Sequence, residues 1–152
     1  MGEGRTLIEL VTVMAATGVM FLVAMPFFLA VRRVVGEAVN GAKVLFEARE
    51  ALHWLGRDVM GARSLSTSGG RMKVSTLAEG GRSVEYRFVK GKGLIRRVEG
   101  KGSMLLAPHA LRVEFRRRGR TLKVRLLLPA GGGRLDIWTE FLARNLGGGE
   151  WR

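Results

Sequence analysis

The chain has 152 residues, which is enough for one folded domain and excludes a large multi-domain enzyme. Hydrophobic residues make up 47% and charged residues 26%, so an intrinsically disordered chain is also excluded. Lys and Arg exceed Asp and Glu by 13, so the protein should be attracted to phosphate, anionic lipid or an acidic partner. Cysteine is absent, which excludes disulfides, thiolate metal sites and thiol nucleophiles. Glutamine is also absent and Arg is favoured over Lys, a usage typical of thermophile proteins.

An uncharged run of 22 residues extends from Leu10 to Val31. As a helix, this run is long enough to cross the roughly 30 Å hydrocarbon core of a bilayer. Burying a helix of this length inside a soluble domain would require a larger protein. No Ala-x-Ala site follows Phe28 before Arg32 and Arg33, so a conventional cleaved secretory signal fits poorly. The sequence therefore predicts a transmembrane helix near the N-terminus.

Glu9 lies just before this run, where a carboxylate in a membrane helix is costly. It belongs to the sequence Gly4-Arg5-Thr6-Leu7-Ile8-Glu9-Leu10, which resembles the N-terminal motif of type IV pilins and pseudopilins. The resemblance implies that a prepilin peptidase cuts between Gly4 and Arg5, that the new amine is methylated, and that Glu9 becomes the fifth residue of the product. Arg5 stands where the family usually has Phe or Met. Pro26 holds the place of a proline that often loosens the helix in this family.

The resemblance also implies a role for each of these residues in a filament. Apolar helices pack side by side there with little water, so an unpaired amine or carboxylate would be costly. The amine of Arg5 is expected to pair with Glu9 of a neighbouring subunit, and Pro26, which lacks an amide proton, lets the helix bend or locally melt. More bases follow the apolar run than precede it, which favours a cytoplasmic head. The resemblance instead implies a periplasmic head on a single-pass inner-membrane anchor.

A second helical pattern follows the membrane run. Apolar residues at spacings of three and four form one stripe between residues 42 and 66. The stripe consists of Leu45, Ala48, Leu52, Leu55, Val59 and Ala62. We therefore expect an amphipathic helix over 32–66 that continues the first helix and covers a sheet. Gly56 and Gly61 inside it are candidate sites of close packing.

After Ser66 the hydrophobic period changes to two, which is typical of half-buried strands. The alternating apolar residues are Val84, Tyr86, Phe88, Leu111, Val113, Phe115, Leu122, Val124 and Leu126. Glycine turn signals recur about every ten residues, as in antiparallel hairpins. They lie at Gly69-Gly70, Gly80-Gly81, Gly91/Gly93, Gly100/Gly102, Gly119 and Gly131 to Gly133. The sequence predicts an α+β fold, in which a long N-terminal helix packs against an antiparallel β head, a meander of about five to seven strands.

This layout is also the pilin-like layout, and the head resembles minor pilins and the J type of pseudopilin. The likeness rests on Arg57-Asp58 followed by Ala62, on Val84 to Val98 (VEYRFVKGKGLIRRV) and on Thr139 to Asn145 (TEFLARN). The resemblance divides the chain into a leader over 1–4, a transmembrane or filament-core helix over 5–31, an amphipathic helix over 32–66 and a β head over 67–152.

The sequence contains no recognisable catalytic or metal-binding set. His53 and His109 lie far apart and lack acidic or cysteine neighbours at metal-ligand spacing. Gly91-Lys92-Gly93 and Gly131 to Gly133 lack the Lys-Ser/Thr of a phosphate loop, so we interpret them as hairpin turns. No Gly-x-Ser-x-Gly elbow occurs. We expect neither an enzyme nor a bound cofactor or metal.

The head is strongly basic, with 25 Lys/Arg and 11 Asp/Glu after Val31. Its candidate contacts with DNA or with a partner are Arg96, Arg97, Arg116, Arg117, Arg118 and Arg120. Clustered arginines attract DNA phosphates, but the aromatic residues of the strands fall in the buried register and leave no evident stacking platform. A solvated, ion-paired surface is favoured over DNA binding, and pairing with acidic neighbouring pilins is a third option.

Taken with the resemblance, these features predict a minor pilin or pseudopilin that assembles through its apolar helix into a type IV pilus-like or type II secretion filament, at or near the tip. The implied partners are other pilins, the prepilin peptidase, the inner-membrane assembly platform and membrane lipid. Two alternatives stay open. One is a DNA-binding minor pilin for competence, and the other is a signal-anchored basic membrane protein that keeps its first four residues.

Overall fold

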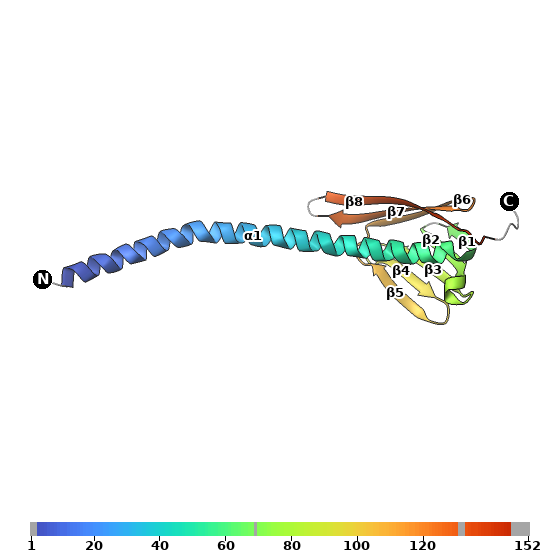
Figure 1. Cartoon of the computed structure of the whole chain (residues 1–152), viewed down its shortest axis with the longest axis horizontal. Coiled ribbons are helices and arrows are strands. Elements are labelled where there is room, and N and C mark those ends of the chain that lie inside the picture. The colour runs from blue at the N-terminus through green and yellow to red at the C-terminus, as the bar shows by residue number, and fades with distance from the viewer. Residues whose placement is uncertain (1–2, 69, 131–132, 147–152) are drawn as a thin grey trace. The chain divides into compact units, whose positions relative to one another are not determined.

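The computed structural model describes residues 3–68, 70–130 and 133–146, with side chains from residue 7 onward. The chain divides into two units, Met1–Val39 and Asn40–Arg152. Within the described residues, one long helix is followed by eight strands (Figure 1). The fold is α+β, as the sequence predicts, with a long apolar N-terminal helix and antiparallel sheets packed against its C-terminal part.

Helix α1 runs from Glu3 to Met60. Its N-terminal part is long and apolar enough to cross a membrane, as predicted from the run Leu10 to Val31. None of its most apolar window is buried against other described residues. Apolar surface of this kind is typical of helices covered by lipid or by another apolar helix.

Helix α1 ends before the limit predicted from the apolar stripe. The stripe predicts a helix as far as residue 66, but α1 ends at Met60 and strand β1 occupies Ala62–Ser68. Four of the five residues from Ser64 to Ser68 are Ser or Thr, which are poor helix formers, and β1 pairs with β2 (Arg71–Thr76). Tertiary pairing therefore overrides the helical period in this segment.

The stripe itself is partly correct. Ala48, Leu55, Val59 and Ala62 are buried and Leu52 is partly buried, but Leu45 is 56% exposed. The buried face of α1 instead includes Val44, Ala51 and the acidic residues Glu47 and Asp58. Each acid has a hydrogen-bond partner in the head, buried Tyr86 for Asp58 and exposed His109 for Glu47, which a pattern of apolar residues alone does not reveal.

The head contains two sheets rather than one meander. The first is antiparallel, in the order β1, β2, β3 (Ser83–Val89), β4 (Gly93–Val98) and β5 (Gly102–Ala107). A short 3-10 helix, η1 (Leu77–Glu79), connects β2 and β3. The second sheet has the order β6 (Arg112–Arg118), β7 (Thr121–Ala130) and β8 (Gly133–Leu142). The eight described strands exceed the predicted five to seven, and one of them, β1, lies in the segment predicted as helix. The two sheets lie on different sides of the C-terminal part of α1 (Figure 1).

The alternating patterns predict the inward faces of the strands well. The buried members are Val84, Tyr86, Val113, Phe115, Leu122, Val124 and Leu126. Phe88 is partly buried, and Leu111 is 46% exposed because it precedes β6. The predicted glycine turns fall at the connections between strands, although Gly69, Gly131 and Gly132 lie outside the described residues.

Two glycines allow α1 to approach its neighbours closely, as predicted. A Cβ atom on Gly56 would lie 2.9 Å from Cε1 of Phe141, which is on β8. A Cβ atom on Gly61 would lie 2.9 Å from the Thr76 hydroxyl oxygen at the end of β2. The second sheet thus meets α1 at Gly56, and the first sheet lies close to Gly61, the residue that directly follows α1.

Candidate functional site

The residues predicted for processing and assembly lie at the N-terminal end of α1. Gly4 and Arg5 belong to the first turn of the helix, and their side chains fall outside the described residues. Glu9 is exposed and is the one charged residue between Leu7 and Val31. A carboxylate on an apolar helix needs a positive partner wherever water is scarce. The structure thus leaves Glu9 available for an ion pair with another group.

The other polar groups of this segment are satisfied within the helix. The hydroxyls of Thr12 and Thr17 donate to the carbonyl oxygens of Ile8 and Val13, each at 2.7 Å. These bonds are typical of threonines in helices surrounded by apolar groups. Helix α1 continues through Pro26, and the role of this proline as a flexible point stays a prediction.

One face of the apolar segment carries a groove, which we call the helix groove. It is a shallow, open depression bordered by Ala16, Val19, Met20, Val23, Ala24 and Phe27. The lining residues recur at helical spacing, and the two alanines leave room for another backbone to come close. The helix groove is therefore suited to packing against a second apolar helix.

Exposed apolar side chains also continue beyond the charged residues Arg32 and Arg33. They are Val34, Val35, Val39, Leu45 and Phe46, which are between 54% and 67% exposed. A contiguous apolar surface of this kind marks an interaction site on a protein. Because these residues follow the charged pair in the chain, lipid alone does not account for them.

A buried ion network, formed by Asp58, Glu79, Tyr86 and Arg96, joins the end of α1 to the first sheet. The side chain of Asp58 is fully buried, and one of its oxygens accepts hydrogen bonds from the Tyr86 hydroxyl at 2.7 Å and from Nε of Arg96 at 2.8 Å. Glu79 of η1 accepts from Nη2 of Arg96 at 2.9 Å and from Nζ of Lys101 at 2.9 Å. Among the described residues, no buried side-chain polar atom lacks a hydrogen-bond partner.

The network changes how its members ionise. The hydrogen bond from Lys101, followed by that from Arg96, lowers the pKa of Glu79 from 4.5 to about 2. Burial, together with the charge of Asp58, raises the pKa of Tyr86 well above its usual range. Burial opposes the charge on Arg96, but its hydrogen bonds to Asp58 and Glu79 outweigh burial and raise the pKa of the guanidinium. The Arg96 guanidinium thus stays charged inside the head.

The position of Arg96 corrects one sequence prediction. Arg96 is predicted as a possible contact for DNA or a partner, but it is 5% exposed and is buried on the inward face of β4. Its guanidinium also lies 4.7 Å from the ring centre of Trp54, and that of Arg57 lies 4.0 Å from the same ring. Arg96 therefore holds α1 against the first sheet rather than contacting a partner.

One sequence signal could have located this network. Leu94, Arg96 and Val98 alternate along β4, so a strand period of two places Arg96 on the same face as two apolar residues. Asp58 likewise precedes the stripe residue Val59 and lies on the buried side of α1. Recognising that these two opposite charges would meet requires knowing that β4 packs against α1, which is a tertiary fact.

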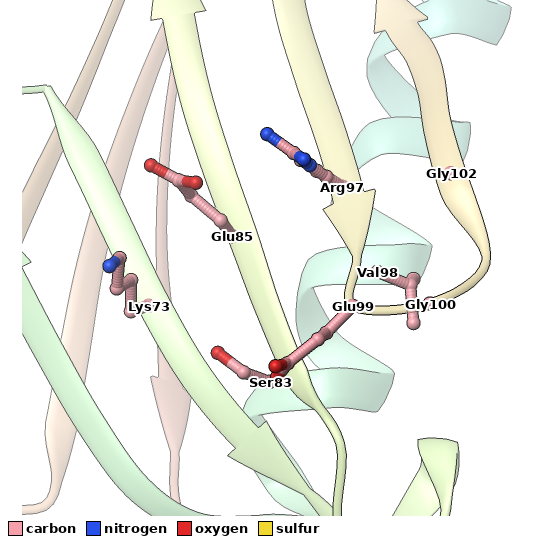
Figure 2. A pocket seen from close by; sticks show the side chains of 8 residues that line it. All are labelled: Lys73, Ser83, Glu85, Arg97, Val98, Glu99, Gly100 and Gly102. Atoms are coloured by element: carbon pink, nitrogen blue, oxygen red, sulfur yellow. The ribbon is translucent and has the colours of Figure 1, made fainter.

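Arg97 lies on the opposite face of β4, at a hollow of about 480 Å³ (Figure 2). Lys73, Glu85 and Arg97 form one row across β2, β3 and β4, with Lys73 opposite Glu85 and Glu85 opposite Arg97. Figure 2 shows these side chains on the face of the sheet turned away from α1, with Glu99 nearby. Carboxylates interleaved with cations favour a solvated mixed-charge surface over a tract for phosphates.

The four arginines predicted at the β6–β7 hairpin are brought together by its turn, on the other sheet from Arg97. Nε of Arg117 donates to the Gly119 carbonyl oxygen at 2.9 Å, and its Nη1 donates to the Leu65 carbonyl oxygen of β1. Arg117 thus links the edges of the two sheets. Arg116 forms an ion pair with Glu114 at 3.4 Å, while Arg118 and Arg120 are exposed.

The two histidines have separate surroundings. Nδ1 of His109 lies 2.8 Å from one oxygen of Glu47, whereas His53 is exposed and packs its ring edge against Trp54. In the part of the chain that the structure describes, no three His, Asp or Glu side chains are grouped as a metal site would require. Gly91 and Lys92 lie in the turn between β3 and β4, as predicted, and Gly93 is the first residue of β4.

Comparisons of the chain with protein-family models, with curated proteins and with solved structures found no match.

Proposed function

We propose that the chain is a minor pilin or pseudopilin, a structural subunit of a type IV pilus-like or type II secretion filament. In this proposal it is an inner-membrane protein with its head in the periplasm, and a prepilin peptidase cuts it between Gly4 and Arg5. It then assembles through α1 with other pilins on the inner-membrane platform. It turns over no substrate.

The observation that carries the proposal is the exposed apolar surface of α1, in which Glu9 is the one charged residue between Leu7 and Val31. A helix that only anchors a protein needs about 20 apolar residues. Here the exposed apolar surface continues to Phe46, beyond Arg32 and Arg33. A neighbouring helix covers such a surface in a filament, and the helix groove offers small residues for close approach.

Glu9 supports the same proposal. A carboxylate inside the bilayer costs about 2.5–3.5 kcal/mol at the centre and less towards the interface. A simple membrane anchor gains nothing from it, whereas a filament subunit can pair it with the free amine of a neighbour. In the proposal, this pair sets the register of adjacent helices.

The processing step tests the proposal directly. The full chain is produced in cells that contain a prepilin peptidase, and the mass of its N-terminal peptide is measured. We expect the peptide to begin at Arg5 and to carry one added methyl group. The matched control Gly4→Leu should keep all residues before Arg5. A wild-type peptide that still begins before Arg5 in such cells would support the signal-anchored alternative and refute the proposal.

A further inference from the structure

The head contains a hollow whose polar lining comes from three separate elements. Its volume is about 670 Å³, and Asn40 and Lys43 of α1, His109 of the β5–β6 connection and Arg134 of β8 all border it. Pro129 is among the residues that complete the wall. All of these residues lie in the unit Asn40–Arg152 and are described by the structure. We call this feature the basic hollow.

The charges that border the basic hollow are positive. Lys43 and Arg134 are exposed, and neither forms an ion pair with a described acidic side chain. No acidic residue is among the lining residues, unlike the hollow of Figure 2, which Glu85 and Glu99 border. An anion in the basic hollow would therefore meet two cations and an amide without an opposing carboxylate.

His109 is held in place at this hollow by a buried acid. Its Nδ1 lies 2.8 and 3.0 Å from the two oxygens of Glu47, whose side chain is 9% exposed. The other ring nitrogen, Nε2, has no hydrogen-bond partner among the described residues. When the ring is protonated both nitrogens donate, so Nε2 becomes a third donor that an oxyanion can use.

We propose that the basic hollow binds a phosphate group, with Lys43 and Arg134 as charge partners and Nε2 of His109 as a further donor. Phosphate presents several acceptor oxygens to such donors, and a guanidinium can bind it through two parallel hydrogen bonds. The phosphate is supplied either by a lipid head group or by free phosphate in solution. The site does not depend on the pilin proposal.

The two histidines make a selective experiment possible. The full chain is held in neutral detergent micelles, and the side-chain NMR signals of His109 and His53 are followed while inorganic phosphate replaces chloride at constant ionic strength. We expect a saturable shift of the His109 signal and none of His53, which does not border the hollow. The double variant Lys43→Ala/Arg134→Ala should weaken binding at least about tenfold, whereas the control Lys92→Ala/Arg118→Ala should leave it unchanged.

A second arm distinguishes the two sources of phosphate. The full chain is placed in nanodiscs that contain phosphatidylglycerol, with no phosphate in the buffer. A His109 shift there that the double variant abolishes assigns the site to a lipid head group, and a response to inorganic phosphate alone assigns it to the free ion. Equal, unsaturated shifts of both histidines would mean an adventitious ion only. That result, or no response in either arm, would overturn the proposal.

Discussion

At the scale of single residues, Asp58 and Glu79 show how a basic chain uses its few acids. Each accepts hydrogen bonds from buried Arg96, and together they neutralise a guanidinium that would otherwise be costly inside the head. Across the second sheet, Arg125 and Asp136 also form an ion pair, at 2.7 Å, but both side chains remain about one-third exposed. The two pairs have similar geometry and different burial, so their removal should have different consequences.

The first prediction compares these two acids. Asp58→Ala leaves Arg96 and Tyr86 buried without their shared acceptor, so we expect a loss of about 3–5 kcal/mol in the free energy of unfolding. Asp136→Ala removes an exposed acid, whose partner Arg125 can turn to water, so its effect should be much smaller. Urea unfolding of the full chain in detergent, followed by the fluorescence of its tryptophans, measures both. Equal losses in the two variants would contradict the structural role of the network.

The second prediction concerns pH. The pKa of Glu79 is lowered to about 2 in the folded head, and its ordinary value is 4.5. The stability that Glu79 contributes is therefore fully present above about pH 4.5 and is lost as the pH falls towards 2. Unfolding curves of the wild type and Glu79→Gln should converge over this window. Glu85→Gln, which removes a half-buried acid outside the ion pairs of the described residues, should run parallel to the wild type throughout.

At the scale of elements, the C-terminal part of α1 has one face that is buried in the head and another face that exposes apolar residues. Residues from Val44 to Val59 present a buried face to both sheets, while Leu45 and Phe46 on the same stretch stay exposed. The buried face contains two acids as well as apolar residues. Asp58 belongs to the buried ion network, and Glu47 forms a hydrogen bond with His109. The exposed apolar residues contribute little to the core and are available to a neighbour.

The third prediction distinguishes the role of the exposed apolar face of α1 from that of its buried face. Phe46 is 67% exposed, so Phe46→Ser should change the free energy of unfolding by no more than about 0.5 kcal/mol. If the exposed apolar surface packs against another subunit, the same variant should enter filaments several-fold less well. Leu55→Ser, at a fully buried position, should instead unfold the head. Normal incorporation of Phe46→Ser would remove this surface from the assembly interface.

At the scale of the whole molecule, the proposed assembly depends on one acid in an apolar helix. Glu9 is the one charge between Leu7 and Val31, and Glu37 is a second exposed acid later in the same helix. Only the first lies where water would be excluded in a membrane or a filament core. The two acids therefore form a matched pair for testing whether position, rather than charge, matters.

The fourth prediction uses this pair. Glu9→Ala should leave membrane insertion and cleavage after Gly4 intact, because the helix becomes more apolar, yet incorporation into filaments should fall at least about tenfold as the amine loses its counter-charge. Glu37→Ala should be incorporated normally. Immunoblots of sheared filaments and of membranes from the producing cells measure both quantities. Normal incorporation of Glu9→Ala would defeat the role assigned to Glu9.

The sequence by itself determined the features that depend on local periodicity. The apolar run from Leu10 to Val31 determined a membrane-length helix, and the alternation in β3, β6 and β7 determined which side chains face inward. Glycines marked the turns, because positive φ angles at positions such as Gly91 and Gly119 are open to glycine and to few other residues. These signals need no knowledge of distant parts of the chain.

Only the tertiary structure decided where α1 ends, how the strands divide into two sheets and where the arginines lie. The segment from Ala62 forms a strand rather than a continuation of the helix, because β2 pairs with it. Arg96 can be buried because it forms ion pairs with Asp58 and Glu79, which lie 38 and 17 residues away in the sequence. The basic hollow likewise combines α1 with the β5–β6 connection and with β8. Buried charges and convergent sites depend on which elements meet, and a local pattern in the sequence carries no record of such long-range contacts.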